Sequence, residues 1–219
     1  MCGGNDPSPR MSHHPEVRHD ADSPKRQAVI EAAGELFIAQ GYGAVSMDAI
    51  ARAAGVSKAT LYAHFASKDA LFATIINEAC QHSMGLRDLL PKHADDIAAA
   101  LTALGQQMLR FLLDAKPLAI HRVVVAESIR FPELGQAFYA NGPEHFRRAF
   151  STWLATQASA GRLTVPDPDM AADQFVGMLR APGVFLRASL GLPPPPTDAE
   201  IDATVAAAVR TFVKAYAPE

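Results

Sequence analysis

The sequence predicts an all-α protein with a small N-terminal helical unit and a larger C-terminal helical domain. Residues that cap helix starts recur ahead of segments whose apolar side chains are spaced three and four apart. Glycines and prolines separate these segments, and no alternating apolar and polar run is long enough to indicate a β-strand. With 219 residues, 49% of them hydrophobic, the chain can bury a substantial core.

The composition excludes several classes of protein. There are 20 Lys and Arg against 23 Asp and Glu, so the net charge of −3 argues against a uniformly basic coat but not against a local basic patch. Cys2 and Cys80 are too few for a disulfide scaffold or a cysteine-rich zinc site. No apolar stretch approaches the roughly 20 residues of a membrane helix, and no signal peptide is evident. We therefore expect a cytoplasmic protein that needs no membrane, metal or cofactor.

The N-terminal segment, residues 1–22, contains Gly, Pro, Ser, His and Asp but almost no bulky apolar residue. Such a segment cannot bury enough surface to offset the entropy lost on ordering, and we expect a disordered arm.

Four helices are predicted between residues 23 and 83. Each begins at a serine whose hydroxyl can accept a hydrogen bond from the first turn: Ser23, Ser46, Ser57 and Ser67. Glycine adopts the left-handed conformation at low cost, so Gly41 is expected to end the first helix and Gly55 the second. Short connections between these helices predict one compact unit.

The second and third of these helices have the pattern of a helix-turn-helix. Small residues at Ala51 and Ala54 permit close approach, and Gly55 provides the turn. On the third helix, Leu61 and Phe65 share the inward face. The outward and flanking positions lack any acid and carry small, hydroxyl, phenol and basic side chains, which suit contacts with phosphates and base edges: Lys58, Ala59, Thr60, Tyr62, Ala63 and His64.

The order of these features is also that of a known domain. The residues that carry the match are Ala32-Ala33, Leu36-Phe37, Gly41-Tyr42, the run from Ser46 to Ala51, the run from Ala54 to Ser57, the run from Thr60 to Phe65, and the run from Ser67 to Leu71. The stretch from Arg26 to Ile76 thereby resembles the DNA-binding domain of the TetR family of bacterial transcriptional regulators. The resemblance covers about a quarter of the chain, without gaps.

The resemblance implies roles for particular residues. Ser46 resembles the family's phosphate-contacting cap, Thr60 and Tyr62 its groove residues, and Lys68 its phosphate-gripping lysine at the start of the fourth helix. Lys58 is a candidate for a guanine contact, and His64 a further candidate for DNA contact. The alternatives are structural, because Ser46 can act only as a cap, Tyr62 can pack on Tyr42, Lys68 can solvate a helix end and His64 can bond within the domain.

The remainder of the chain, residues 84–219, is predicted to be helical over Asp95–Ala115, Leu118–Ile129, Glu133–Ala140, Glu144–Ala160, Pro168–Leu190 and Asp198–Tyr216. Thr197 and Glu200 form a capping box for the last of these, and Asp167 caps the helix before it. We expect Pro117 to mark a break and Pro182 to kink a helix. The resemblance implies that this domain binds a small molecule and pairs two subunits.

Candidate residues for an effector pocket lie on the middle helices. They are the large apolar, aromatic and imidazole side chains Met108, Phe111, Leu112, His121, Phe138, Phe146, Phe150 and Trp153. Arg122, Glu127 and Arg130 are candidate polar anchors, although Glu127 and Arg130 can also form a surface pair three residues apart. Aromatic residues at helical spacing are more often ordinary core, which is the alternative for each of them.

The last two predicted helices carry apolar residues on more than one face, which suits a partner subunit as well as the core. These residues are Phe175, Met178, Leu179, Val184, Phe185, Val205, Val209, Phe212 and Val213.

The sequence favours a homodimeric repressor that binds a palindromic operator in double-stranded DNA and is released by an apolar or amphipathic small molecule. An activator or an architectural DNA-binding protein of the same fold, without a ligand, is the alternative. No nucleophile–base arrangement, zinc spacing or phosphate-binding loop indicates an enzyme.

Overall fold

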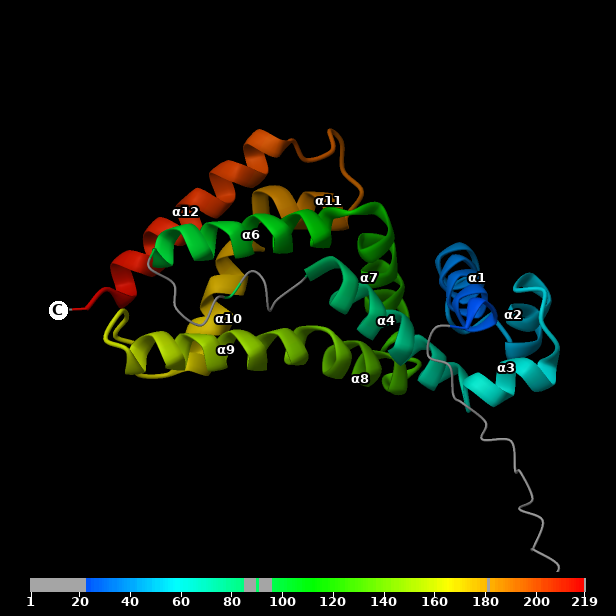
Figure 1. Ribbon diagram of the computed structural model, residues 1–219. Helices are drawn as coiled ribbons and strands as arrows, with labels where there is room; N and C mark the ends of the chain where they lie inside the picture. The colour runs from blue at the N-terminus through cyan, green and yellow to red at the C-terminus, as the bar shows by residue number, and fades with distance from the viewer. Residues whose placement is uncertain (1–22, 85–89, 91–95, 181, 219) are drawn as a thin grey trace, which may run out of the picture.

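The computed structural model describes residues 23–84, 90, 96–180 and 182–218. Over these ranges the chain forms helices and no β-strand, in agreement with the predicted all-α class. Helices α1 (Pro24–Gln40), α2 (Met47–Ala53) and α3 (Lys58–His64) gather at one end of the molecule (Figure 1). The arm expected at residues 1–22 lies outside the described residues.

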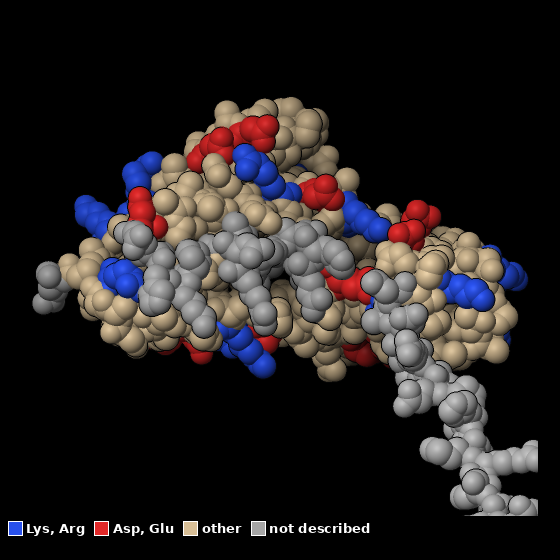
Figure 2. Space-filling model, in the orientation of Figure 1, with Lys and Arg blue, Asp and Glu red and all other residues tan. Residues whose placement is uncertain are grey.

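Helix α4 (Lys68–Met84) leads from this end toward a larger group of helices (Figure 1). The group comprises α6 (Ile97–Leu113), α7 (Ala115–Glu127), α8 (Pro132–Asn141), α9 (Pro143–Ser159), α10 (Pro168–Leu179), a π-helical turn η1 (Pro182–Leu186), α11 (Arg187–Ser189) and α12 (Asp198–Tyr216). None of the described helices is both long enough and apolar enough to span a bilayer. Lys, Arg, Asp and Glu are interspersed over the face that Figure 2 shows.

Local capping accounts for most helix starts. The hydroxyls of Ser46, Ser57 and Ser67 accept hydrogen bonds of 3.0–3.1 Å from backbone N–H groups three residues on, as predicted. Asp167 caps α10, and Thr197 forms the predicted capping box with Glu200. The expected cap at Ser23 is wrong in one respect, because its side chain makes no capping bond although α1 begins at the next residue.

Two predicted helix boundaries differ from the structure because of proline. Pro117 was expected to mark a break, but it lies in the first turn of α7, where a missing N–H costs no helical hydrogen bond. The helix predicted over Pro168–Leu190 is not continuous. It divides into α10, η1 and α11, because Pro182 cannot donate the hydrogen bond that an α-helix needs there.

Two hydrophobic cores hold these helices together. The first joins α1–α4 and also takes in Ile120 and Val124 of α7 and Leu134 of α8. The second joins α6, α9, α10 and α12, with Phe175 packed edge-on against Phe212 at a centroid distance of 5.3 Å. Most residues predicted to suit a partner subunit, among them Phe175, Val205 and Phe212, are buried within this chain. For these residues the structure favours the core alternative.

Candidate DNA interface and effector cavity

The turn between α2 and α3 fixes the angle of the third helix. Gly55 has a φ of +66°, which L side chains rarely adopt, and a Cβ there would meet no atom within 4 Å. The positive φ of the backbone, and not a lack of room for a side chain, therefore requires glycine at this position. The N–H of Val56 donates to the carbonyl oxygen of Ala51 at 3.0 Å, which closes the turn.

Helix α3 presents one side to the core and the other to solvent. Leu61 is 0% and Phe65 is 3% exposed, whereas Tyr62 is 45% exposed. Lys58 is also exposed, and Thr60 is half-buried. Tyr62 and Lys58 on the predicted DNA-contacting side thus face solvent, and the ring partners of Tyr42 are Phe37, Phe72 and Phe131, not Tyr62.

Contacts within the N-terminal unit already orient part of this surface. The Lys58 ammonium pairs with Asp48 of α2 at 2.8 Å and lies 6.0 Å from the centroid of the Tyr62 ring. Its hydrogen bond to Asp48 raises the pKa of Lys58, so the side chain remains charged. The hydroxyl of Thr60 is 2.8 Å from that of Ser57. Because the Lys58–Asp48 pair is exposed, a phosphate or a base edge can compete for the ammonium.

Ser46 and His64 flank this surface. Ser46 is exposed at the start of α2, and its hydroxyl already accepts from the N–H of Ala49. His64 is half-buried, with its ring 6.3 Å from that of Phe65. The capping alternative for Ser46 is present, and the DNA contacts of both residues remain predictions.

Lys68 points inward, unlike the exposed Lys58. Its Nζ donates to the carbonyl oxygens of Tyr42 and Val45 at 2.8 and 3.0 Å and lies 4.2 Å from the centroid of the Tyr42 ring. Burial lowers the pKa of Lys68. Two of its three donors are thereby used within the protein, so Lys68 stabilises the segment between α1 and α2. Its contact with a phosphate stays a prediction.

Glu127, at the end of α7, holds the same segment from the other side. Its carboxylate accepts hydrogen bonds from the backbone N–H groups of Tyr42 and Gly43, each at 2.7 Å. The Tyr42 hydroxyl in turn donates to Asp69 of α4. A Cβ at Gly43 would lie 2.7 Å from the Phe131 ring, so this close approach requires glycine. We refer to Glu127 with the N–H groups of Tyr42 and Gly43 as the latch.

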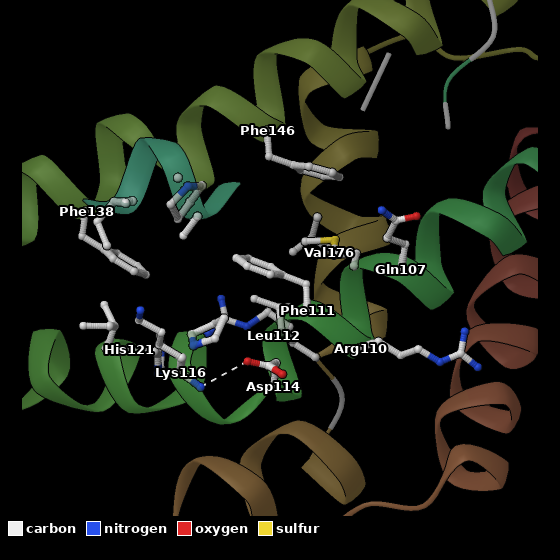
Figure 3. A pocket seen from close by; sticks show the side chains of 18 of the residues that line it. Gln107, Arg110, Phe111, Leu112, Asp114, Lys116, His121, Phe138, Phe146 and Val176 are labelled. Carbon is white, nitrogen blue, oxygen red and sulfur yellow. Dashed lines mark hydrogen bonds between the residues drawn. The ribbon is translucent and has the colours of Figure 1, made fainter. Parts of the chain in front are cut away.

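A cavity of about 1380 Å³ lies between the N-terminal helices and the larger group. The rings of Phe111 from α6, Phe138 from α8 and Phe146 from α9 point toward this space (Figure 3). Met108, Leu112 and His121 also line it, as predicted. Its wall includes Ile30 and Glu31 of α1 and Ile75, Ile76 and Glu78 of α4, so it reaches the unit that carries the helix-turn-helix.

Two of the residues predicted for an effector pocket lie outside this cavity. Phe150 and Trp153 do not line the cavity but stack on each other at 6.0 Å between centroids, 0% and 5% exposed, in the second core. They lie on α9 with Phe146, four and seven residues further along, where α10 packs closely and leaves no space.

The predicted polar anchors also lie elsewhere. Arg122 donates to the carbonyl oxygens of Ala188 and Ser189, Glu127 forms the latch, and none of Arg122, Glu127 and Arg130 lines the cavity. The charged residues that do line it were not found from the sequence: Glu31, Glu78, Arg110, Asp114, Lys116, Arg147, Asp173 and Arg180. They come from α1, α4, α6, α7, α9 and α10 and from the residues that cap these helices, so no single sequence pattern brings them together.

An exposed recognition helix on a compact platform, joined to a larger helical group with a cavity, defines a helix-turn-helix regulator with a separate ligand-sized space. Comparison with known proteins agrees. Residues 29–75 match the family described as bacterial regulatory proteins, tetR family, and residues 99–218 match the AefR-like transcriptional repressor, C-terminal domain. The chain belongs to the TetR family of transcriptional regulators, whose members bind DNA and dimerise.

Individual relatives support this assignment. The flavonoid-responsive regulator FrrA is 40% identical, with 89% of this chain and 98% of that chain covered at a TM-score of 0.73. A TetR family transcriptional regulator from Pseudomonas syringae pv. tomato DC3000 is 30% identical, with 90% and 98% covered at a TM-score of 0.68. The HTH-type transcriptional activator FasR from Mycolicibacterium smegmatis is 38% identical over 73 residues, which is only 33% of each chain.

Proposed function

We propose that the protein is a cytoplasmic, non-enzymatic homodimeric repressor that leaves a palindromic DNA operator when a small aromatic molecule binds in the cavity. Residues 23–83 bind DNA in this proposal, and residues 84–219 bind the effector and pair the subunits. The observation that carries it is the position of the cavity, whose wall is formed by both the effector-binding helices and α1 and α4 of the DNA-binding unit.

On the DNA side, the proposal assigns base contacts to the outer surface of α3. Tyr62 and Thr60 lie in the major groove, Lys58 exchanges Asp48 for a guanine or a phosphate, and Ser46 faces the backbone. A dimer places two copies of α3 in successive major grooves, roughly 34–36 Å apart. The exposed side of α12, with Ala203, Ala207 and Thr211, supports pairing through small residues that permit close approach.

On the effector side, the proposal follows the apolar rings that line the cavity and the relative FrrA, which is named as flavonoid-responsive. A flavonoid is a planar, amphipathic aromatic molecule, and three phenylalanine rings together with an imidazole suit its faces. The effector can shift the equilibrium between the DNA-binding and the released conformation only by the difference in its binding free energy for the two. This difference is typically about 1–3 kcal/mol.

The test is a gel-shift titration with the intergenic DNA upstream of the coding region. We expect a sequence-selective complex at moderate salt, at least tenfold weaker binding by Tyr62→Ala, and release by 7-hydroxyflavone. Absence of a selective complex, or unchanged affinity in Tyr62→Ala, would overturn the assignment of α3. Lys58→Ala is compared with Lys214→Ala, an exposed lysine at the far end of α12. We expect only Lys58→Ala to change DNA binding. If Lys58 contacts a phosphate, the slope of log affinity against log salt concentration should fall by about one; if it contacts a guanine, the sequence preference at one base pair should relax.

An activator is the second candidate, because FasR is named as a transcriptional activator. The distinction is made with a reporter gene under the upstream promoter. Deletion of the regulator raises expression if it represses and lowers expression if it activates.

A further inference from the structure

One arginine of the cavity differs from the others in its surroundings. Arg180 is the C-cap of α10, and its guanidinium carbon lies 4.5 Å from the centroid of the Phe185 ring of η1. Both residues line the cavity. The charge therefore lies against an aromatic ring at the point where α10 ends.

The aromatic wall continues from Arg180 toward the apolar part of the cavity. The Phe185 ring lies edge-on to the His121 ring at 5.6 Å between centroids, and His121 lies edge-on to Phe138 at 6.0 Å. In Figure 3, Phe138 and His121 lie across the space from the α6 backbone that carries Phe111, whose ring points toward them. One surface thus runs from a cation through three rings supplied by η1, α7 and α8.

The other two arginines of the cavity are neutralised by carboxylates. Arg110 extends toward α12 (Figure 3), where it pairs with Asp198 and Asp202 at 3.7 and 3.4 Å. Arg147 pairs with Glu144 and Asp169 at 2.8 and 2.9 Å. Among the described residues, Arg180 forms no such ion pair. Arg180 is exposed as a whole residue, and partial desolvation of its guanidinium lowers its pKa; none of the described carboxylates pairs with it.

The carboxylates that line the cavity do not supply the missing charge. Glu78 pairs with Arg26, Glu31 accepts from Gln27, and Asp114 accepts from the N–H of Lys116. Asp173 is on α10 seven residues before Arg180, which is about 10 Å along the helix axis. An accessible guanidinium that lies against an aromatic ring and pairs with none of the described carboxylates can bind a ligand anion.

His121 adds a second polar contact without adding charge. Burial lowers the pKa of His121, and the nearby charges of Arg180 and Arg122 lower it further. The ring is therefore neutral near pH 7 and offers one N–H donor and one acceptor. A neutral imidazole does not compete with Arg180 for an anion, and its face can stack on a ligand ring.

We propose that Arg180 determines the effector class: the ligand is a planar aromatic molecule with a negatively charged oxygen, a phenolate or a carboxylate. This oxygen pairs with Arg180, while the rings extend along Phe185, His121 and Phe138. The inference rests on the proposed function, because it takes the cavity as the effector site. It goes beyond the named response of FrrA to flavonoids by specifying which chemical group is bound and which residue binds it.

The test is isothermal titration calorimetry on the full-length dimer with two matched pairs of probes. The pair 7-hydroxyflavone and 7-methoxyflavone differs by an ionisable phenol, and the pair 2-naphthoate and methyl 2-naphthoate differs by a carboxylate. We expect at least one anionic probe to bind at least tenfold more tightly than its methylated partner. The pair that shows the difference distinguishes phenolate from carboxylate as the source of the charge.

The variants are Arg180→Gln, Arg180→Lys and, as a matched control, Arg110→Gln. We expect Arg180→Gln to weaken the anionic probe at least tenfold and its neutral partner less than twofold. Arg180→Lys keeps a cation and should keep most of the discrimination, which also separates a lost charge from a misfolded variant. Arg110→Gln should preserve the discrimination, because its charge is already paired with α12.

Equal affinity for charged and neutral probes, equal losses of both in Arg180→Gln, or no binding of any probe would overturn the inference. Failure of the proposed function is distinguishable. If neutral probes bind and release the operator with Arg180 irrelevant, the inference alone fails. If the protein forms no selective complex with DNA in the absence of any probe, the proposed function fails.

Discussion

Removing the Glu127 carboxylate is expected to release the segment between α1 and α2 without unfolding the helices on either side. In Glu127→Ala, the N–H groups of Tyr42 and Gly43 each lose a hydrogen bond of 2.7 Å to a charged acceptor. Lys68 still binds this segment through the carbonyl oxygens of Tyr42 and Val45. We therefore expect a local opening rather than global unfolding.

The magnitude follows from the two bonds. A hydrogen bond to a charged group contributes about 1.5–3 kcal/mol to stability. Glu127 is half-buried and Gly43 is exposed, so water partly replaces the carboxylate and each bond contributes only about 1–1.5 kcal/mol. Losing both bonds should lower the free energy of local opening by about 2–3 kcal/mol. At 1.4 kcal/mol per factor of ten, amide exchange becomes roughly 30- to 140-fold faster.

The assay is hydrogen exchange of the Tyr42 and Gly43 amides, followed by NMR. Glu127→Gln retains an acceptor oxygen for one N–H and is expected to show an intermediate acceleration. Glu35→Ala removes an exposed acid from α1 and serves as the control for a change of net charge. Unchanged protection of both amides in a folded Glu127→Ala protein would refute the latch.

Two further predictions concern the larger helical group. A Cβ at Gly105 would lie 2.9 Å from Val205, so Gly105→Ala should lower the melting temperature because overpacking of about 1–3 kcal/mol exceeds the roughly 1 kcal/mol gained in helix propensity. Gly177→Ala, which meets nothing within 4 Å, should raise it. The Thr197 N–H and the Arg187 guanidinium hold the pKa of Glu200 at about 2, so its stabilising effect is complete above its ordinary pKa near 4.5 and is lost as the pH falls toward 2. An NMR titration should show this value and its rise in Arg187→Gln.

Features that depend on neighbouring residues could be predicted from the sequence. The caps at Ser46 and Ser57 act on N–H groups three residues away, and the inward direction of Leu61 follows from helical spacing. For this reason the sequence alone predicts α3 and its exposed side.

Features that depend on distant residues could not be predicted. The sequence suggests that Glu127 is either a polar anchor of the pocket or a partner of Arg130, yet the groups that it binds are 84 and 85 residues away. Phe146 and Phe150 occupy the same helix and differ only in whether the opposing wall leaves space. Helical periodicity identifies an apolar face, but it does not tell a filled core from a cavity.

Helix α7 contacts both the cavity and the N-terminal unit. His121, near its middle, lines the cavity, and Glu127, at its end, forms the latch. An effector that displaces α7 acts on the segment that leads into α2, and Lys68 limits how far this segment can follow. The latch links α7 to the N-terminal unit beside the packing of Ile120 and Val124 in the first core. Its strength of about 2–3 kcal/mol is comparable to the coupling of about 1–3 kcal/mol that is typical of allosteric sites, so loss of the latch alone is large enough to account for the proposed release.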